Sequence, residues 1–342
     1  MVSPRRRISF MWDVEGIQLP DGAEIVTQRD GKVRIWVDTP PDMDGFIGRH
    51  CEECQQTFRV HGEDYEALQD LLRCVYCGRQ GDARSFATPQ QHDRAKTAIW
   101  DLAAQALLKS VKGLSDDRQI MFGDHPYRPQ PLARINEAPV VRKRSCPSCA
   151  RRYAVFHQHR FCPACGPLTP DVVALDALDA ATATLDMLKQ MPAEQAASLR
   201  ELGVFDQLRV NALKDLVGIV ETLADAVFRA VVTDADNKLQ GRSMRNVFQR
   251  LDDIANLFAA EGHVDLRVDL GGAKWQRLQA TWQARHLFVH NDGIVDTDYV
   301  AKVGGASNAL LGQRLVISEQ RCREAISDTR DLCQALSKLR RP

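Results

Sequence analysis

The chain has 342 residues, which is long enough for two or three domains with at least one well-filled hydrophobic core. Its 45 Lys and Arg residues balance 45 Asp and Glu residues, so net charge excludes neither a nucleic acid nor a protein as partner. No stretch approaches the roughly 18 uninterrupted apolar residues of a membrane span, and no cleavage-like site follows the arginines at 5–7. We therefore expect a cytoplasmic protein that does not enter a membrane.

Residues 1–48 are predicted to form an N-terminal β segment. Short strands at 23–27 and 33–37 flank Asp30 and Gly31, a dipeptide that is typical of hairpin turns. We expect these two strands to pair in an antiparallel fashion.

A helix is predicted near the end of region 49–110, which otherwise holds the first cysteine quartet. Thr88 can cap this helix, Pro89 suits its first position, and Gln91 can bond back to the cap. Glycines and prolines punctuate residues 111–140, which we interpret as a linker.

Eight of the ten cysteines fall in CxxC pairs, and these pairs form two quartets: Cys51, Cys54, Cys74 and Cys77, then Cys146, Cys149, Cys162 and Cys165. Two CxxC turns facing each other can place four thiolates tetrahedrally around zinc, and the spacings resemble those of zinc ribbons. Redox-active cysteines and an iron–sulfur cluster are the alternatives. Because the protein supplies all four ligands, we expect two structural Zn²⁺ ions and no catalytic metal.

The two ribbons differ in charge. The second, assigned to residues 141–170, carries six basic and no acidic side chains: Arg142, Lys143, Arg144, Arg151, Arg152 and Arg160. Tyr153, Phe156 and Phe161 lie among them and could stack on the bases of RNA, or could instead fill the small ribbon core. Residues 49–82 hold seven acidic and four basic residues, so the first ribbon is better suited to a protein partner.

Beyond the second ribbon the sequence becomes almost continuously helical. Residues 171–204 are predicted to form connecting helices broken near Pro192. Region 205–342 is predicted to form an antiparallel four-helix bundle from four longer segments: 207–232, 241–260, 272–290 and 318–339. Cys322 and Cys333 follow the apolar stripe of the last helix and are expected in the core. The fold class is therefore mainly α, preceded by two small β modules.

The third bundle helix ends in a cluster of chemically active side chains. Its buried stripe is predicted to contain Trp275, Leu278, Trp282 and Val289. His286 and His290 are four residues apart and share a face, with Arg285 beside them. The helix terminus there favours positive charge, so a structural capping role for these residues is the alternative to a catalytic one.

Arg285 is followed directly by the polar residue His286 and, five positions after Arg285, by His290. This R-x4-H pattern, at the end of the third helix of a predicted four-helix bundle, resembles the HEPN superfamily. The resemblance covers about residues 205–340. It implies metal-independent RNA cleavage by a homodimer whose two motifs line one cleft, with the catalytic residues Arg285, His290, His286 and Asn291. It also implies a role in antiviral defence, stress response or toxin activity. Some members carry a modifiable Tyr where this chain has Asp292, so that form of regulation is not implied.

Two other functions remain open from the sequence. In the first, the bundle is a non-catalytic module for dimerisation and the ribbons dock on a nucleic acid or a protein. In the second, the basic ribbon belongs to a DNA-binding regulator. Only the enzyme requires the pair formed by Arg285 and His290.

Overall fold

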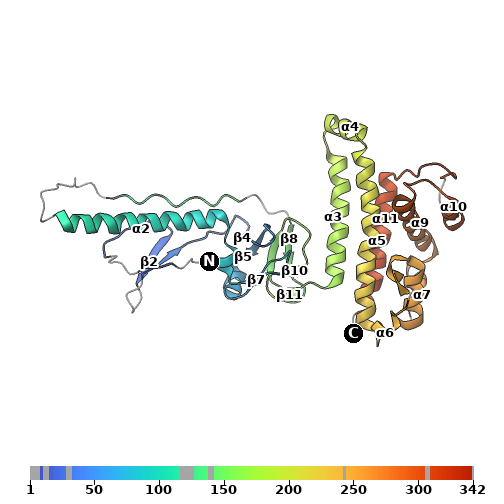
Figure 1. The fold of residues 1–342 in the computed structure, drawn as a ribbon, viewed down its shortest axis with the longest axis horizontal. Helices are drawn as coiled ribbons and strands as arrows, with labels where there is room; N and C mark the ends of the chain where they lie inside the picture. The colour runs from blue at the N-terminus through green and yellow to red at the C-terminus, as the bar shows by residue number, and fades with distance from the viewer. Residues whose placement is uncertain are drawn as a thin grey trace. The chain divides into compact units, whose positions relative to one another are not determined.

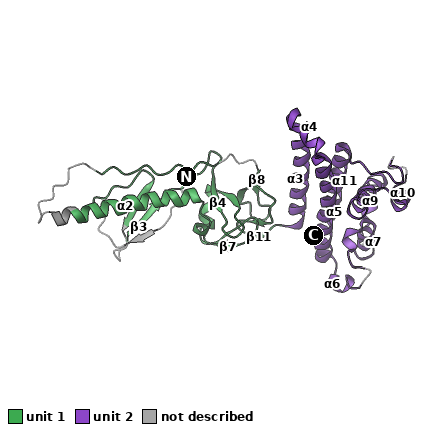
Figure 2. Cartoon of the chain, turned by 45° about the horizontal axis from the view of Figure 1, so that its top comes forward, with its two compact units in different colours: residues 1–168 green, residues 169–342 purple. Residues whose placement is uncertain are grey.

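The computed structural model describes residues 8–10, 15–27, 33–115, 127–137, 142–241, 244–262, 264–304 and 309–340. They belong to two compact units, Met1–Leu168 and Thr169–Pro342 (Figure 2). The first unit combines small antiparallel sheets with one long helix, and the second is helical. Each unit is considered by itself below.

A three-stranded antiparallel sheet packs on the long helix of the first unit. Its strands are β1 (Ile8–Phe10), β2 (Ala23–Thr27) and β3 (Val33–Val37), and their order in the sheet is β1-β3-β2. The strands β2 and β3 pair as expected, while the Asp30-Gly31 turn lies outside the described residues. Every second residue of β3 is buried, and Ile35 joins Leu102 of the helix in a small hydrophobic core. Alternating burial of this kind is what one covered sheet face requires.

The long helix α2 spans Pro89–Ser115 and begins at the predicted capping box. The Gln91 backbone N–H donates to the Thr88 hydroxyl at 3.3 Å, and the Thr88 N–H donates to the Gln91 side-chain oxygen at 3.2 Å. The described part of the expected linker, residues 127–137, is held along this helix. For example, the Gln130 N–H donates to Asp101 at 3.0 Å. Residues 111–115 of the expected linker belong instead to α2, which continues to Ser115, and residues 116–126 and 138–140 lie outside the described part.

Both cysteine quartets belong to one structure rather than to two separate modules. A four-stranded antiparallel sheet has the order β4-β5-β9-β8, so the β4-β5 hairpin of the first quartet pairs with the β8-β9 hairpin of the second through β5 and β9. Its strands are β4 (Phe46–His50), β5 (Thr57–His61), β8 (Arg142–Ser145) and β9 (Arg152–Val155).

Shorter elements complete the first unit around this sheet. Two small hairpins carry the remaining cysteine pairs, β6 with β7 (Leu72–Arg73, Gln80–Gly81) and β10 with β11 (Phe161–Cys162, Gly166–Pro167). The helical turns in this region are α1 (Gly62–Tyr65), η1 (Glu66–Leu68) and η2 (Ala83–Phe86).

The second unit is a helical bundle (Figure 1). Its long helices are α3 (Pro170–Gln190), α5 (Val204–Val231), α9 (Gly272–His290) and α11 (Glu319–Leu339). Shorter helical segments connect them: α4 (Ala193–Glu201), α6 (Ala235–Lys238), η4 (Val247–Gln249), α7 (Leu251–Gly262), α8 (Leu266–Leu270) and α10 (Thr297–Val303). The helices α3, α5 and α11 lie side by side and pack against one another.

Three details differ from the sequence-based expectation. The helix α3 is part of the bundle and not only a connection, because Leu178, Leu185 and Leu188 enter its core. The segment expected as a helix at 241–260 becomes regularly helical only in α7, after the short turn η4. Val289 is 43% exposed and lies outside the buried stripe, which continues instead through Leu287.

Cys322 and Cys333 are buried in the core of the bundle, as the periodicity of α11 predicts. The Ser318 side chain accepts a hydrogen bond from the Arg321 N–H and caps that helix. No helix among the described residues has the length and apolar character needed to cross a bilayer.

Candidate metal centres and the Arg–His groove

The structure brings together all eight predicted cysteine ligands in two clusters. Within each quartet the sulfur atoms lie within 4.8 Å of one another. Sulfur–sulfur distances are 3.6 Å for Cys51 and Cys77 and 3.5 Å for Cys146 and Cys165. With Zn–S bonds of about 2.3 Å, a tetrahedral site has an S–S edge of about 3.8 Å. The donor sets therefore fit two closed, structural zinc sites.

All four CxxC turns share one backbone feature. The residue after the second cysteine has a positive φ in all four turns: Gln55 at 57°, Gly78 at 80°, Ala150 at 57° and Gly166 at 105°. Glycine tolerates this region at no steric cost, whereas Gln55 and Ala150 are strained there. The strained conformation aims both thiolates of a turn at one point, and zinc binding there would compensate its energetic cost.

The electrostatics of the thiols also favour a cation. Burial raises the pKa of Cys74 and Cys162, which are fully buried. Burial also opposes ionisation of Cys146, but hydrogen bonds from the backbone of Cys149 and Ser148 lower the pKa of the Cys146 thiol to about 7. Four converging thiolates require a positive ion between them.

The basic side chains of the second ribbon are partly neutralised by the first unit's own acidic residues. Arg151 and Arg152 contact Asp64 at 3.0 and 3.2 Å, and Lys143 contacts Asp44 at 2.6 Å. Arg142, Arg144 and Arg160 complete the predicted RNA-binding set; Arg142 and Arg144 are half-buried, and Arg160 is exposed. The opposite charges of the two ribbons therefore stabilise their contact, and less of the basic cluster faces solvent than the sequence suggests.

The aromatic residues of the second ribbon are divided between its core and its surface. Tyr153 is 1% exposed and its hydroxyl lies 3.0 Å from His159 Nε2. Phe161 packs beside Gly78, and Phe156 is 38% exposed. Of these three aromatic residues, Phe156 is the most exposed and the best placed to stack on a base.

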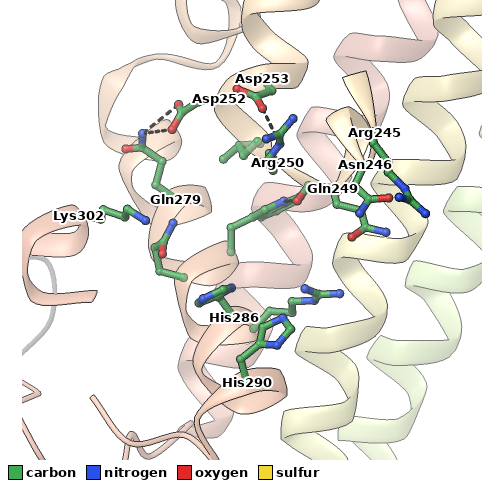
Figure 3. Close-up of a pocket in the computed structure, with 14 residues that line it drawn as sticks. Arg245, Asn246, Gln249, Arg250, Asp252, Asp253, Gln279, His286, His290 and Lys302 are labelled. Atoms are coloured by element: carbon green, nitrogen blue, oxygen red, sulfur yellow. Dashed lines mark hydrogen bonds and ion pairs between the residues drawn. The ribbon is translucent and has the colours of Figure 1, made fainter. Parts of the chain in front are cut away.

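Arg285, His286 and His290 line a single open groove of about 580 Å³ in the helical unit (Figure 3). The rings of His286 and His290 lie 4.7 Å apart between centroids, as their spacing on α9 predicts. Both imidazoles are exposed and Arg285 is half-buried. Arg285 and His290 point about 140° apart on a regular helix, yet the long Arg side chain reaches the same groove.

The surroundings of His286 favour its neutral form. Partial burial, His290 and the Lys302 ammonium lower the pKa of His286 below its usual value, and Arg285 acts in the same direction. The Asp296 carboxylate opposes the shift. A histidine with a lowered pKa is neutral at neutral pH and can accept a proton there.

Asn291 has a different position from the other predicted catalytic residues. Its side-chain amide donates to the Ile294 carbonyl at 2.7 Å, within the turn that ends α9, and it does not line the groove. Gly293 in the same turn has a φ of 78°, and its N–H donates to Leu287 O at 3.0 Å. The described contacts of Asn291 are those of a helix-terminating residue.

Several groove residues were not identified from the sequence. Arg245 and Arg250 come from the segment around η4, Lys302 comes from α10, and Gln279 lies two turns before His286 on α9. Arg245, Arg250 and Lys302 lie far from the Arg–His motif along the chain and belong to no motif of their own, so only the tertiary structure brings them to it. Gln279 could have been placed on the face of His286 and His290 from helical periodicity, since it lies seven residues before His286.

A scan against models of protein families, a search of curated proteins and a search of solved structures each found no match to this chain.

Proposed function

We propose that the protein is a metal-independent endoribonuclease of the HEPN type, with its active site in the Arg–His groove. The observation that supports this proposal best is the convergence of Arg285, His286 and His290 on one solvent-accessible, basic groove. A purely capping role would leave these side chains on carbonyls of their own helix. Among the described residues, Arg285 forms no ion pair, so its guanidinium is available to a phosphate.

The groove offers the groups that RNA cleavage requires. Neutral His286 removes the proton of a 2′-hydroxyl, and the 2′-oxygen forms a bond to phosphorus. The bond from phosphorus to the 5′-oxygen breaks, and His290 in its protonated form gives that oxygen a proton. Arg285 stabilises the negative charge of the transition state. The products are a 2′,3′-cyclic phosphate and a free 5′-hydroxyl.

The HEPN resemblance also leads us to propose a homodimer in which two α9 termini form a composite site. Each protomer supplies one Arg285 and one His290, so a twofold axis near these residues doubles the catalytic groups. Mixing an Arg285→Ala variant with a His290→Ala variant tests this arrangement. A composite site regains part of the wild-type cleavage rate in the mixed dimers, whereas no recovery shows that each protomer acts alone.

The central test is cleavage of RNA by single-residue variants. Arg285→Ala and His290→Ala should each lower kcat by about 10²–10⁴-fold. Gln276→Ala, an exposed residue of α9 outside the groove, is the matched control and should keep the wild-type rate. Product analysis should show cyclic phosphate ends, and brief EDTA treatment should leave the rate unchanged. A folded His290→Ala protein that cleaves normally would refute the catalytic assignment.

The competing function is a binding module without catalysis. It predicts that the wild-type protein binds RNA or a protein partner but produces no new RNA ends. In the proposed enzyme, the two zinc sites stabilise the first unit, which we propose selects the substrate or a partner protein.

A further inference from the structure

The groove contains more positive charge than the Arg–His motif supplies. Arg245, Arg250, Arg285 and Lys302 line it, against Asp252 and Asp253. Both carboxylates are already engaged. Asp253 contacts Arg250 at 2.6 Å, while Asp252 accepts hydrogen bonds from Trp275 Nε1 at 3.2 Å and from the Gln279 amide.

The cations that remain lie on different walls of the groove. Among the described residues Arg245 forms no ion pair, and the contact of Lys302 with Asp298 is long, at 3.7 Å between exposed side chains. In Figure 3, Arg245 and Lys302 lie on opposite sides of the two histidines, on the η4 and α10 sides of α9. A strand that crosses the His pair therefore meets a cation before and after it.

We propose that Arg245 and Lys302 bind the phosphates that flank the scissile one, so that the groove takes a single-stranded polynucleotide. This inference rests on the proposed function, and it adds two residues outside the Arg–His motif. Gln279 and Gln283 also line the groove. The Gln279 amide N–H₂ already donates to Asp252, so the Gln279 side-chain oxygen and the Gln283 amide are the groups that can hydrogen-bond to the edges of unpaired bases. A duplex would hide those edges.

Binding is measured in the His290→Ala background with a labelled 12-nucleotide oligouridine, and again with a duplex of the same length. Arg245→Gln and Lys302→Gln should each weaken single-strand binding by about fivefold. Each should also reduce the magnitude of the negative slope of log K against log salt by about 0.7, the value for one lost phosphate contact on a single strand. Lys189→Gln, an exposed cation on α3, should change neither quantity.

Unchanged salt slopes in both variants, or tighter binding of the duplex, would overturn this inference while leaving the cleavage proposal intact. In the cleaving protein, the same two variants should raise KM and largely keep kcat. Normal cleavage by the His290→Ala protein would instead refute the proposed function, whatever the salt slopes are.

A second, independent inference comes from the symmetry of the cysteine-rich sheet. Two hairpins, β4-β5 and β8-β9, each carry a CxxC turn between their strands. Arg59 and Ala154 each follow the first cysteine of their hairpin by eight residues, and they are direct partners where β5 pairs with β9. The neighbouring pairs, Phe58 with Val155 and Val60 with Tyr153, are then related by the same pseudo-twofold axis.

The remaining cysteine turns also contact each other across this axis. The Arg73 N–H donates to the Pro163 carbonyl at 3.0 Å, next to one ligand of each quartet. The Phe161 N–H donates to the Val75 carbonyl at 3.0 Å. The Phe161 ring covers Gly78, where an added Cβ would lie 2.7 Å from the ring. The four buried ligands of the two quartets share one hydrophobic cluster: Cys51, Cys74, Cys146 and Cys162.

We infer that the two metal sites form and empty together, because each quartet is held by strands and turns that the other quartet organises. Neither ribbon has a complete sheet or core without its partner. Zinc bound at one site thereby stabilises the backbone that presents ligands at the other.

The test is the zinc content of purified protein by elemental analysis. Cys146→Ser and Cys74→Ser, in different quartets, should each reduce zinc from about two ions per chain to nearly none. Retention of about one ion in either variant would refute the coupling. In the wild-type protein, a chromogenic chelator should remove both ions in one kinetic phase. Two separate phases of equal amplitude would also refute it, without any substitution.

Discussion

Gly293 provides a sharp test of how the end of α9 is built. Its φ of 78° lies in the left-handed region, and an added Cβ would lie 2.5 Å from Phe288 Cε1. Gly293 O also accepts the Leu315 N–H at 2.8 Å, so the turn connects α9 to the segment before α11. Gly293→Ala therefore combines backbone strain with a steric clash, three residues after His290.

The magnitude can be separated into its two parts by a matched control. Gly312 has the same φ of 78°, but an added Cβ there would meet no atom within 4 Å. Gly312→Ala should cost about 1 kcal/mol from backbone strain alone. Gly293→Ala should cost about 2–3 kcal/mol, because displacing the half-buried Phe288 ring adds about 1–2 kcal/mol.

Scanning calorimetry on the full chain measures both variants. The transition that zinc chelation leaves unshifted belongs to the helical unit. For a unit of this size about 1 kcal/mol corresponds to about 2–4 °C, so Gly312→Ala should lower Tm by that amount and Gly293→Ala by about 5–10 °C. Equal losses in the two variants would show that Phe288 moves aside freely. The close packing at the end of α9 would then contribute nothing to the position of His290.

Three further predictions concern the helix cap, the groove and a buried carboxylate. Thr88→Ala should destabilise the first unit by about 1 kcal/mol in urea unfolding, because it removes the cap of α2, and an unchanged midpoint would contradict the capping role. If neutral His286 is the general base, kcat should fall below a pH inflection that lies under the usual histidine value, because protonation removes the base. Lys302→Gln should move that inflection upward, and a profile that does not respond to it would argue against the assignment. Arg277→Ala should destabilise the bundle by about 2 kcal/mol, since it leaves the buried Asp328 carboxylate without its two hydrogen bonds at 2.7 and 2.8 Å, and the Asp328→Asn background should remove most of this loss.

Local signals in the sequence were sufficient for the features that depend on residues close together in the chain. The capping box at Thr88 and the periodicity of α9 are of this kind, and α9 has the predicted bounds Gly272–His290. The cysteine quartets were also predictable, because zinc coordination requires four thiolates and CxxC turns supply them in pairs. Helical spacing was likewise sufficient to place His286 beside His290.

Only the tertiary structure decided how distant segments combine. Pairing of β5 with β9 joins the two ribbons and places Asp64 against Arg151, so charges that suggested separate partners neutralise one another. The groove gains Arg245 and Lys302 only when η4 and α10 pack beside α9. Strand pairing and helix packing depend on complementary surfaces from remote parts of the chain, and no local pattern of residues encodes which surfaces will meet.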